Sequence, residues 1–149
     1  MILSDIISVD RTACAVNCQS KKRIFEIISD IACQQQADLD PDDVLASLIS
    51  REKMGSTGIG NGIALPHGRI DGLDDVLAVV VTSDTPIEFD AIDNQAVDIF
   101  FAILVPSEET QAHLQTLAMI AQKLSDKHIV KLIRQAQSRQ DILAALDIV

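Results

Sequence analysis

The middle of the chain contains the stretch Gly55-Ser56-Thr57-Gly58-Ile59-Gly60-Asn61-Gly62-Ile63-Ala64-Leu65-Pro66-His67-Gly68-Arg69. Four glycines within eight residues cost conformational entropy, but they let backbone N–H groups converge on an anion without a Cβ in the way. A tight loop from a helix into a strand is the plainer explanation, and it needs only one or two of them. The stretch is not a Walker A loop, because Asn61 follows Gly60 where that motif needs Lys. The sequence therefore suggests an anion cradle, and the candidate phosphate-binding residues are Ser56, Thr57, Gly58, Gly60 and Gly62.

A histidine stands at the end of this stretch. Pro66 cannot donate to a sheet ladder and favours an extended Leu65, so we expect a strand to end here and present His67 at its tip, with Gly68 turning the chain away. Neutral imidazole is nucleophilic near pH 7, and it can attack phosphorus to form a phosphoramidate. A loop-end histidine without a role is the alternative. The adjacent glycines and nearby arginines favour a phosphoryl acceptor.

A covalently held phosphoryl group needs hydrogen-bond donors around it. Arg51, at the end of the preceding helix, offers a guanidinium fork for its oxygens, and Ser56 and Thr57 offer hydroxyls. Arg69 is either a further donor or a solvated surface arginine. His113 falls beside an apolar helical stripe, so it either faces the site or lies partly exposed on its helix.

Apolar spacing and capping signals define the expected elements. The nearly continuous apolar runs 76–82 and 97–105 predict strands covered on both faces. N-cap signals at Ser20, Asp40-Pro41, Ser107 and Ser138 predict helices, with a shorter one around 129–134. The helix from Ser107 is expected to turn one set of residues inward: Leu114, Leu117, Ala118, Ala121 and Leu124. The whole chain, 1–149, is expected to form a single-domain α/β sandwich, with a central mixed β-sheet flanked by helices on both faces.

The composition limits the function classes. Of the 149 residues, 48% are hydrophobic and 23% are charged, which is typical of a globular protein. The net charge of −10 argues against nucleic acid and anionic membranes as main partners. The N-terminus lacks a signal-peptide pattern, no apolar stretch approaches the roughly 20 residues of a membrane span, and three cysteines without C-x-x-C spacing indicate reduced thiols. We expect a cytoplasmic protein without metal or cofactor.

The central residues resemble a known family. The run from Gly58 to Gly68 is similar to the active-site signature of phosphotransferase-system enzyme IIA domains of the fructose/mannitol type. Further stretches resemble the nitrogen-regulatory branch: Ser20-Lys21-Lys22-Arg23, residues 86–94, and Leu104-Val105-Pro106 leading to His113-Leu114-Gln115-Thr116-Leu117-Ala118. The resemblance covers nearly the whole chain. Two departures are Asn61, where many relatives have His, and Ala96, where many have Pro.

The resemblance implies a phosphotransferase with a phosphohistidine intermediate that acts mainly as a regulator. His67 would take a phosphoryl group on Nε2 from an HPr-like phosphocarrier protein, which enzyme I charges from phosphoenolpyruvate. Arg51 matches the arginine beside the phosphohistidine, and His113 matches a second active-site histidine. The phosphorylation state would regulate downstream proteins. Relatives suggest potassium transport and sensor kinases as possible targets.

Two other functions remain open at this stage. One is a sugar-specific enzyme IIA that passes phosphate to a IIB component. The sequence shows no second domain or membrane segment, which favours the regulatory role. The other is a metal-binding hydrolase using His67 and His113, but the spacing of the usual H-x-H or H-E-x-x-H ligand motifs is absent.

Overall fold

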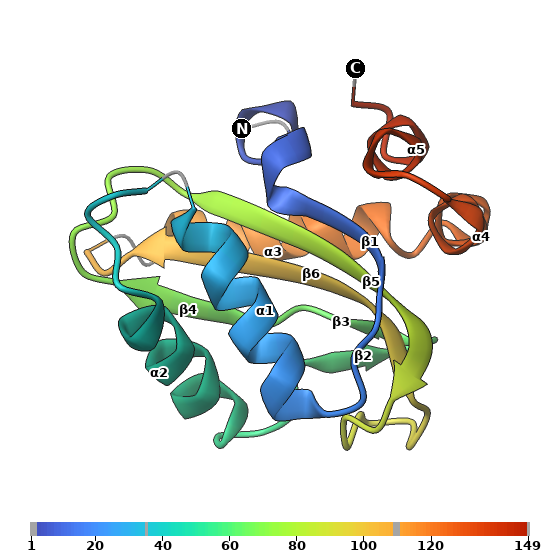
Figure 1. Cartoon of the computed structure of the whole chain (residues 1–149), viewed down its shortest axis with the longest axis horizontal. Coiled ribbons are helices and arrows are strands. Elements are labelled where there is room, and N and C mark those ends of the chain that lie inside the picture. The colour runs from blue at the N-terminus through green and yellow to red at the C-terminus, as the bar shows by residue number, and fades with distance from the viewer. Residues whose placement is uncertain (1–2, 35, 109–110, 149) are drawn as a thin grey trace.

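A computed structural model of the chain describes residues 3–34, 36–108 and 111–148. It is built around a six-stranded mixed sheet, with strand order β1-β5-β6-β3-β2 and β4 paired to β6, and helices cover both faces (Figure 1). The elements are η1 (Leu3–Asp5), η2 (Val9–Arg11), β1 (Thr12–Val16), α1 (Lys21–Cys33), α2 (Pro41–Glu52), β2 (Gly58–Gly60), β3 (Ile63–Ala64), β4 (His67–Ile70), β5 (Leu77–Ile87), β6 (Val97–Pro106), α3 (Gln111–Lys123), α4 (Lys127–Gln135) and α5 (Arg139–Ala145). The predicted α/β sandwich with a mixed central sheet is confirmed.

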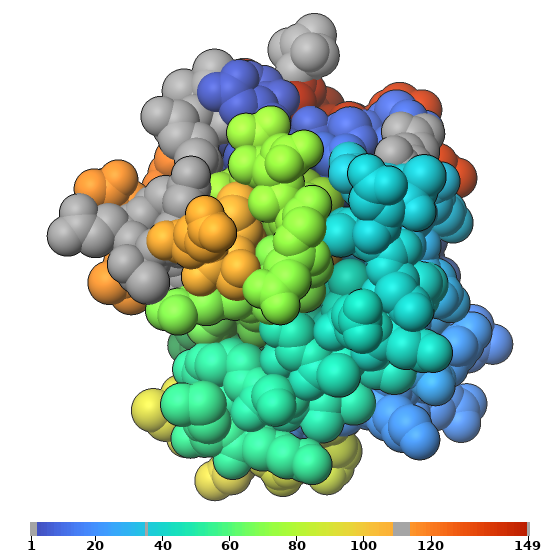
Figure 2. Space-filling model, turned by 90° about the vertical axis from the view of Figure 1, so that its left-hand side faces the viewer, coloured from blue at the N-terminus to red at the C-terminus, as the bar shows by residue number. Residues whose placement is uncertain are grey.

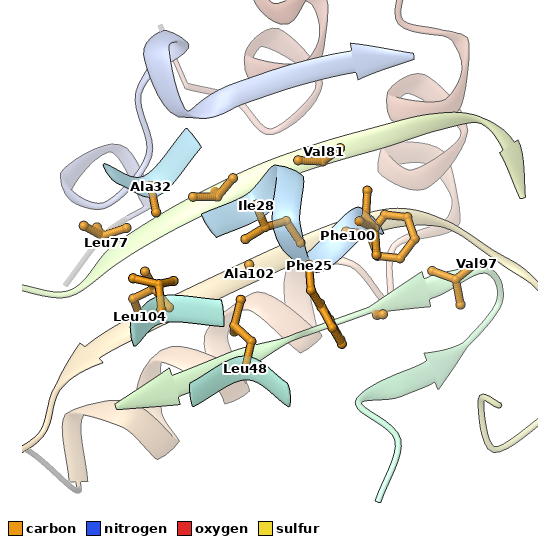
Figure 3. Close-up of a cluster of buried hydrophobic side chains, with 14 of the residues drawn as sticks. Phe25, Ile28, Ala32, Leu48, Leu77, Val81, Val97, Phe100, Ala102 and Leu104 are labelled. Carbon is orange, nitrogen blue, oxygen red and sulfur yellow. The ribbon is translucent and has the colours of Figure 1, made fainter. Parts of the chain in front are cut away.

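The long antiparallel pair β5–β6 supplies both cores, because successive side chains of a strand point to opposite faces. Val79 and Val81 pack against α1 and α2 on one face. Figure 3 shows part of this cluster, with Val81 labelled. Val80 and Phe101 pack on the other face against α3, α4 and α5. All four side chains are at most 1% exposed, which explains why these strands read as nearly continuous apolar runs.

Three of the four predicted helix starts are confirmed by their capping bonds. Ser20 Oγ accepts a hydrogen bond from Arg23 N, and the Asp40 carboxylate accepts one from Asp42 N, with Pro41 opening α2. Ser138 Oγ accepts from the backbone N of residue 141 at the start of α5. The predicted cap at Ser107 is not tested, because α3 is described from Gln111 onward and residues 109–110 lie outside the described part of the chain.

The predicted inward face of α3 is confirmed at three positions and wrong at Leu114 and Ala118. Leu124 is buried, and Leu117 and Ala121 are half-buried and pack against the core. Leu114 is 66% exposed, whereas Ile120 and Leu124 are at most 3% exposed. The helix is therefore rotated so that the line containing Ile120 and Leu124 faces the sheet. Ala118, expected inside, is exposed. Leu114 and Ala118 therefore lie on the solvent side of α3 and not in the core.

Strand β4 follows β3 along the same edge of β6. Ile63 pairs with Ile99 and His67 pairs with Ile103, so both pieces keep the same register on β6. Pro66 interrupts the ladder only where its N–H is missing, and its carbonyl still accepts from Ile103 N at 2.9 Å. The expected strand end near Pro66 is confirmed, because β3 ends at Ala64. The expected turn at Gly68 is wrong, because His67 opens a new strand that runs through Gly68 to Ile70.

Within the described residues, none of the helices has the length and apolarity that crossing a bilayer requires.

Candidate active site

Two hydrogen bonds fix the ring of His67. Its Nδ1 lies 2.9 Å from the carbonyl oxygen of Leu65, and because a carbonyl can only accept, Nδ1 carries the proton. Its Nε2 is then the unprotonated nitrogen, and it accepts a hydrogen bond of 3.1 Å from Arg51 Nε. The network thus selects the neutral tautomer whose nucleophilic atom is Nε2.

Arg51 reaches His67 from the last turn of α2. Its Nη1 also donates to the carbonyl of Gly55 at 2.9 Å, so the guanidinium is held at two points. Helix α2 lies close against β4, because Gly68 leaves room for Ser47, and Ser47 Oγ donates to the Arg69 carbonyl at 3.0 Å. The arginine and the histidine predicted from the sequence are therefore brought together by helix–strand packing.

The surroundings lower the pKa of His67 below its ordinary value of 6.5. Burial of the half-buried ring is the largest cause, and the positive charge of Arg51 acts in the same direction. The hydrogen bond to the Leu65 carbonyl and the charge of Glu52 oppose the shift. The net effect keeps the imidazole neutral, which is the form that can attack phosphorus.

A buried carboxylate next to Arg51 supports the loop that follows α2. Glu52, whose side chain is 7% exposed, accepts hydrogen bonds from Thr57 N at 3.1 and 3.2 Å and from Thr57 Oγ1 at 2.6 Å. Lys21 Nζ forms an ion pair with it at 2.7 Å, and the same ammonium bonds the carbonyl of Phe89 and lies 4.4 Å from the centre of its ring. Sequence reasoning missed this network. No local signal could reveal it, because Lys21 and Glu52 come from different helices.

The two hydroxyl residues predicted as phosphate donors lie beside His67 but are bonded elsewhere. Ser56 Oγ donates to the Phe89 carbonyl at 3.1 Å and accepts from Gly58 N. Thr57 is 5% exposed, and its hydroxyl proton is committed to Glu52. Their contact with phosphate stays a prediction, and it would require these bonds to change.

The glycines of the predicted cradle face different neighbours. Gly58, Gly60 and Gly62 belong to the β2–β3 hairpin, with positive φ at Gly60 (98°) and Gly62 (78°). A Cβ on Gly58 would lie 2.6 Å from the Cβ of Ala91, and one on Gly62 would meet Arg134. Close packing and a tight turn already account for Gly58 and Gly62, and contact of the glycines with an anion stays a prediction.

A pocket of about 340 Å³ opens in front of the ring. The pocket is lined by Arg51, Ser56, Thr57 and the hairpin residue Ile59, together with three residues of α3. The α3 residues are Leu117, Ala118 and Ala121. His113 lies in α3 one turn before Leu117, but its side chain lies outside the described residues, so its predicted role stays a prediction.

Arg69 lies on the same strand, two residues after His67. Alternation along β4 gives both residues the same face, while Gly68 and Ile70 are buried on the other. Arg69 is exposed, so it lies at the open side of the site.

Comparison with known proteins identifies the family. The sequence profile described as "Phosphoenolpyruvate-dependent sugar phosphotransferase system, EIIA 2" matches residues 5–148. The chain belongs to this EIIA family. The resemblance found in the central stretch is thereby confirmed. The chain is therefore a component of a phosphotransferase system.

Individual relatives agree with this EIIA assignment. A "Nitrogen regulatory protein" of Escherichia coli K12 is 50% identical over 143 residues, covering 94% of this chain and 86% of that protein. The crystal structure of nitrogen regulatory protein IIA-Ntr from Neisseria meningitidis has a TM-score of 0.90 at 33% identity, covering 97% of this chain and 98% of that one. The mannitol IIA of Escherichia coli has a TM-score of 0.79 at 17% identity, covering 94% and 98%, and shows the shared fold alone.

Proposed function

We propose that this EIIA domain accepts a phosphoryl group on Nε2 of His67 from an HPr-like phosphocarrier protein, and that its phosphorylation state regulates partner proteins in a nitrogen-related phosphotransferase system in the cytoplasm. The observation that carries the proposal is the pairing of Arg51 Nε with His67 Nε2 while Nδ1 is held by Leu65 O. The ring is neutral and oriented, and a cation lies at the atom that would attack. These are the requirements of phosphoryl transfer by positioning and charge stabilisation.

The transfer step needs only one bond to form and one to break. Nε2 of His67 attacks phosphorus, and the bond between phosphorus and the donor breaks as its electron pair returns to the donor. Nδ1 keeps its proton throughout and keeps its bond to the Leu65 carbonyl. Arg51 Nε must leave the Nε2 lone pair and turn to the phosphate oxygens, where its fork can bind two of them.

The surface around the pocket suits a protein donor better than a small substrate. Met54 is 83% exposed, Ile59 is 44% exposed and Leu114 is 66% exposed. Met54 and Ile59 belong to the segment that follows Arg51, and Leu114 precedes the α3 residues that line the pocket. Exposed apolar side chains around a polar centre are typical of a protein-binding surface. Position 113 shares a helical face with 117 and 121, which supports His113 as a second histidine of the site.

Regulation through the phosphoryl group follows from its charge. A phosphorylated side chain carries up to about two negative charges at neutral pH, and here they would appear at the centre of the docking surface. A partner that recognises Arg51 and the apolar rim of the uncharged form would then be repelled or recruited. The names of the relatives at 50% and 33% identity support nitrogen regulation as the context.

A reconstituted relay of enzyme I, HPr-like donor and phosphoenolpyruvate tests the proposal. The native chain should gain one acid-labile phosphoryl group, whereas His67→Ala should gain none. Labelling that persists in His67→Ala would disprove the site.

The sugar-specific alternative is tested with the phosphorylated protein itself. A solved complex joins the mannitol IIA and phosphorylated IIB of Escherichia coli, and that IIA shares this fold with a TM-score of 0.79. The regulatory function predicts that a IIB component discharges this chain slowly. Rapid and complete discharge would instead assign it to sugar transport.

A further inference from the structure

A second cationic region lies on α4, away from His67. A groove of about 460 Å³ runs along this helix. Lys127, Lys131 and Arg134 line one side, and Leu124 and Val130 provide apolar contacts. Asn61, at the tip of the β2–β3 hairpin, lines the groove as well.

The three cations form a row rather than a cluster. They are spaced four and then three residues apart, so they share one helical face and extend over about 10 Å of α4. Lys127 and Lys131 are exposed, and neither has an ion pair within the described residues. Arg134 is paired with Asp98 at 2.9 Å. The charges of Lys127 and Lys131 are thus not neutralised by a carboxylate of the described residues.

The surrounding segment stands out from the rest of the chain. Residues 123–139 hold five of the twelve Lys and Arg residues and one carboxylate, Asp126, in a protein with a net charge of −10. That carboxylate caps α4 by accepting from His128 N and Ile129 N, so it is turned toward the helix backbone. The segment therefore presents a net positive face.

The opposite end of the molecule has the opposite charge. There the turn after β4 lies beside the start of α2, as Figure 2 shows in green and teal. Both segments carry exposed aspartates: Asp38, Asp40, Asp42, Asp43, Asp71, Asp74 and Asp75. This separation of charge would orient an acidic partner so that it approaches by way of α4.

We propose that the groove along α4 is a docking site for an acidic, extended segment of a partner protein. Alternate residues of an extended chain lie about 7 Å apart, so two or three carboxylates can meet a row of cations about 10 Å long. An apolar residue of the same segment can rest on Leu124 and Val130. A single small anion would meet one or two of these charges and leave the rest of the groove open. The site does not depend on His67 being a phosphoryl acceptor.

Binding would be visible at the hairpin. Arg134 donates to the carbonyl of Asn61 as well as to Asp98. A carboxylate arriving in the groove competes with Asp98 for this guanidinium and so disturbs the turn at Asn61. The NMR signal of the Asn61 amide should therefore report binding in the groove, although Asn61 lies in the β2–β3 hairpin and the lysines lie in α4.

The test is an NMR titration of the ¹⁵N-labelled chain with an octaglutamate peptide at low ionic strength. Amide shifts should concentrate in α4 and at Asn61. The double variant Lys127→Gln/Lys131→Gln should bind about tenfold more weakly, because two exposed ion pairs are lost. The matched control is Lys22→Gln/Lys53→Gln, which removes two exposed lysines from the groove between α1 and α2 and should leave the affinity unchanged.

Three results would overturn the proposal. The first is the absence of shifts in α4 at millimolar peptide, and the second is equal affinity of the Lys127→Gln/Lys131→Gln variant and the native chain. The third is binding of inorganic pyrophosphate to the same amides as tightly as the peptide, which would make the groove a small-anion site. An unchanged amide spectrum of the free variants outside α4 shows that they are folded.

Discussion

Arg51 and Arg134 are two arginines near the ends of helices, and they are used in opposite ways. Arg134 meets a carboxylate, with Nε and Nη2 donating to Asp98 at 2.9 to 3.1 Å. Arg51 meets a neutral imidazole and a backbone carbonyl, and among the described residues it has no ion pair. The carboxylate next to it in sequence, Glu52, is bound to Lys21 and Thr57 instead.

The two arginines differ in whether the fold neutralises their charge, and this difference bears on the proposed phosphoryl transfer. The charge of Arg134 is compensated within the fold, so it joins α4 to β6 and to the hairpin. The charge of Arg51 is left uncompensated beside His67, the proposed nucleophile, where an arriving phosphoryl group would supply an anion. The carboxylate of Glu52 does not neutralise Arg51, because Lys21 and Thr57 bind it.

The largest expected effect is on the rate of phosphoryl acceptance. Replacing Arg51 by Gln should slow labelling of His67 about 100-fold, because the guanidinium that stabilises the transferring group is lost. Arg51→Lys should recover part of the rate, since it restores charge without the fork. Initial rates in the reconstituted relay measure both. If Arg51→Gln is phosphorylated at the native rate, Arg51 does not stabilise the transferring phosphoryl group.

The next effect concerns the carboxylate that is kept away from Arg51. Glu52→Gln should lower the free energy of unfolding by about 2 kcal/mol, because Lys21 loses its partner in a largely buried setting. Urea denaturation measures the loss.

The matched control for this variant is Glu26→Gln. Its ion pair with Arg23 is exposed, with side chains 37% and 56% accessible, so it should cost less than about 0.5 kcal/mol. Equal losses in the two variants would show that the Glu52 network contributes no more than a surface pair.

Arg134→Gln should have a smaller effect, on stability rather than on phosphorylation of His67. Loss of the bonds to Asp98 and to the Asn61 carbonyl should lower the free energy of unfolding by about 1 kcal/mol, because the pair is partly exposed. The rate of His67 phosphorylation should stay within about twofold of the native rate. A rate loss like that of Arg51→Gln would mean that the two arginines are not functionally distinct.

The smallest effect is on the pH dependence. Because the pKa of His67 lies below 6.5, the rate of phosphoryl acceptance at pH 6.5 should be more than half of its plateau value and should fall further in more acidic solution. Arg51→Gln should raise this pKa, because the positive charge of Arg51 lowers it. NMR titration of the His67 ring measures the pKa directly. A pKa above 6.5 in the native chain would contradict the structure.

The lowered pKa also links stability to pH. As the pH falls through about 6.5, the unfolded chain binds a proton at His67 before the native chain does. The contribution of His67 is thus fully present above pH 6.5 and is lost as the pH falls toward the native pKa. Denaturation of His67→Gln should lack this part of the dependence.

Local signals account for what the sequence could predict. The caps at Ser20, Asp40 and Ser138 act within one helical turn, and the apolar runs around Val79 and Phe101 record burial on both faces of the sheet. His67 and Arg51 could be selected because the chemistry of phosphoryl transfer needs a neutral imidazole and a cation nearby.

The errors all involve contacts between distant residues. Strand β1 was not predicted, since it pairs with β5, far along the chain. The packing of Gly58 against Ala91 and of Gly62 against Arg134 was not predicted either. The inward face of α3 was predicted too wide, because Leu114 and Ala118 are exposed while Leu117 and Ala121 pack against the core, a distinction that spacing alone cannot make.

The shared register of β3 and β4 makes the length of the central stretch as restrictive as its composition. One residue inserted between Ala64 and His67 would move the imidazole to the opposite side of the sheet, against Ser47 of α2, where the chain tolerates only glycine. Neighbouring side chains cannot absorb a change of length there. Relatives of this chain should therefore keep the number of residues between Ala64 and His67.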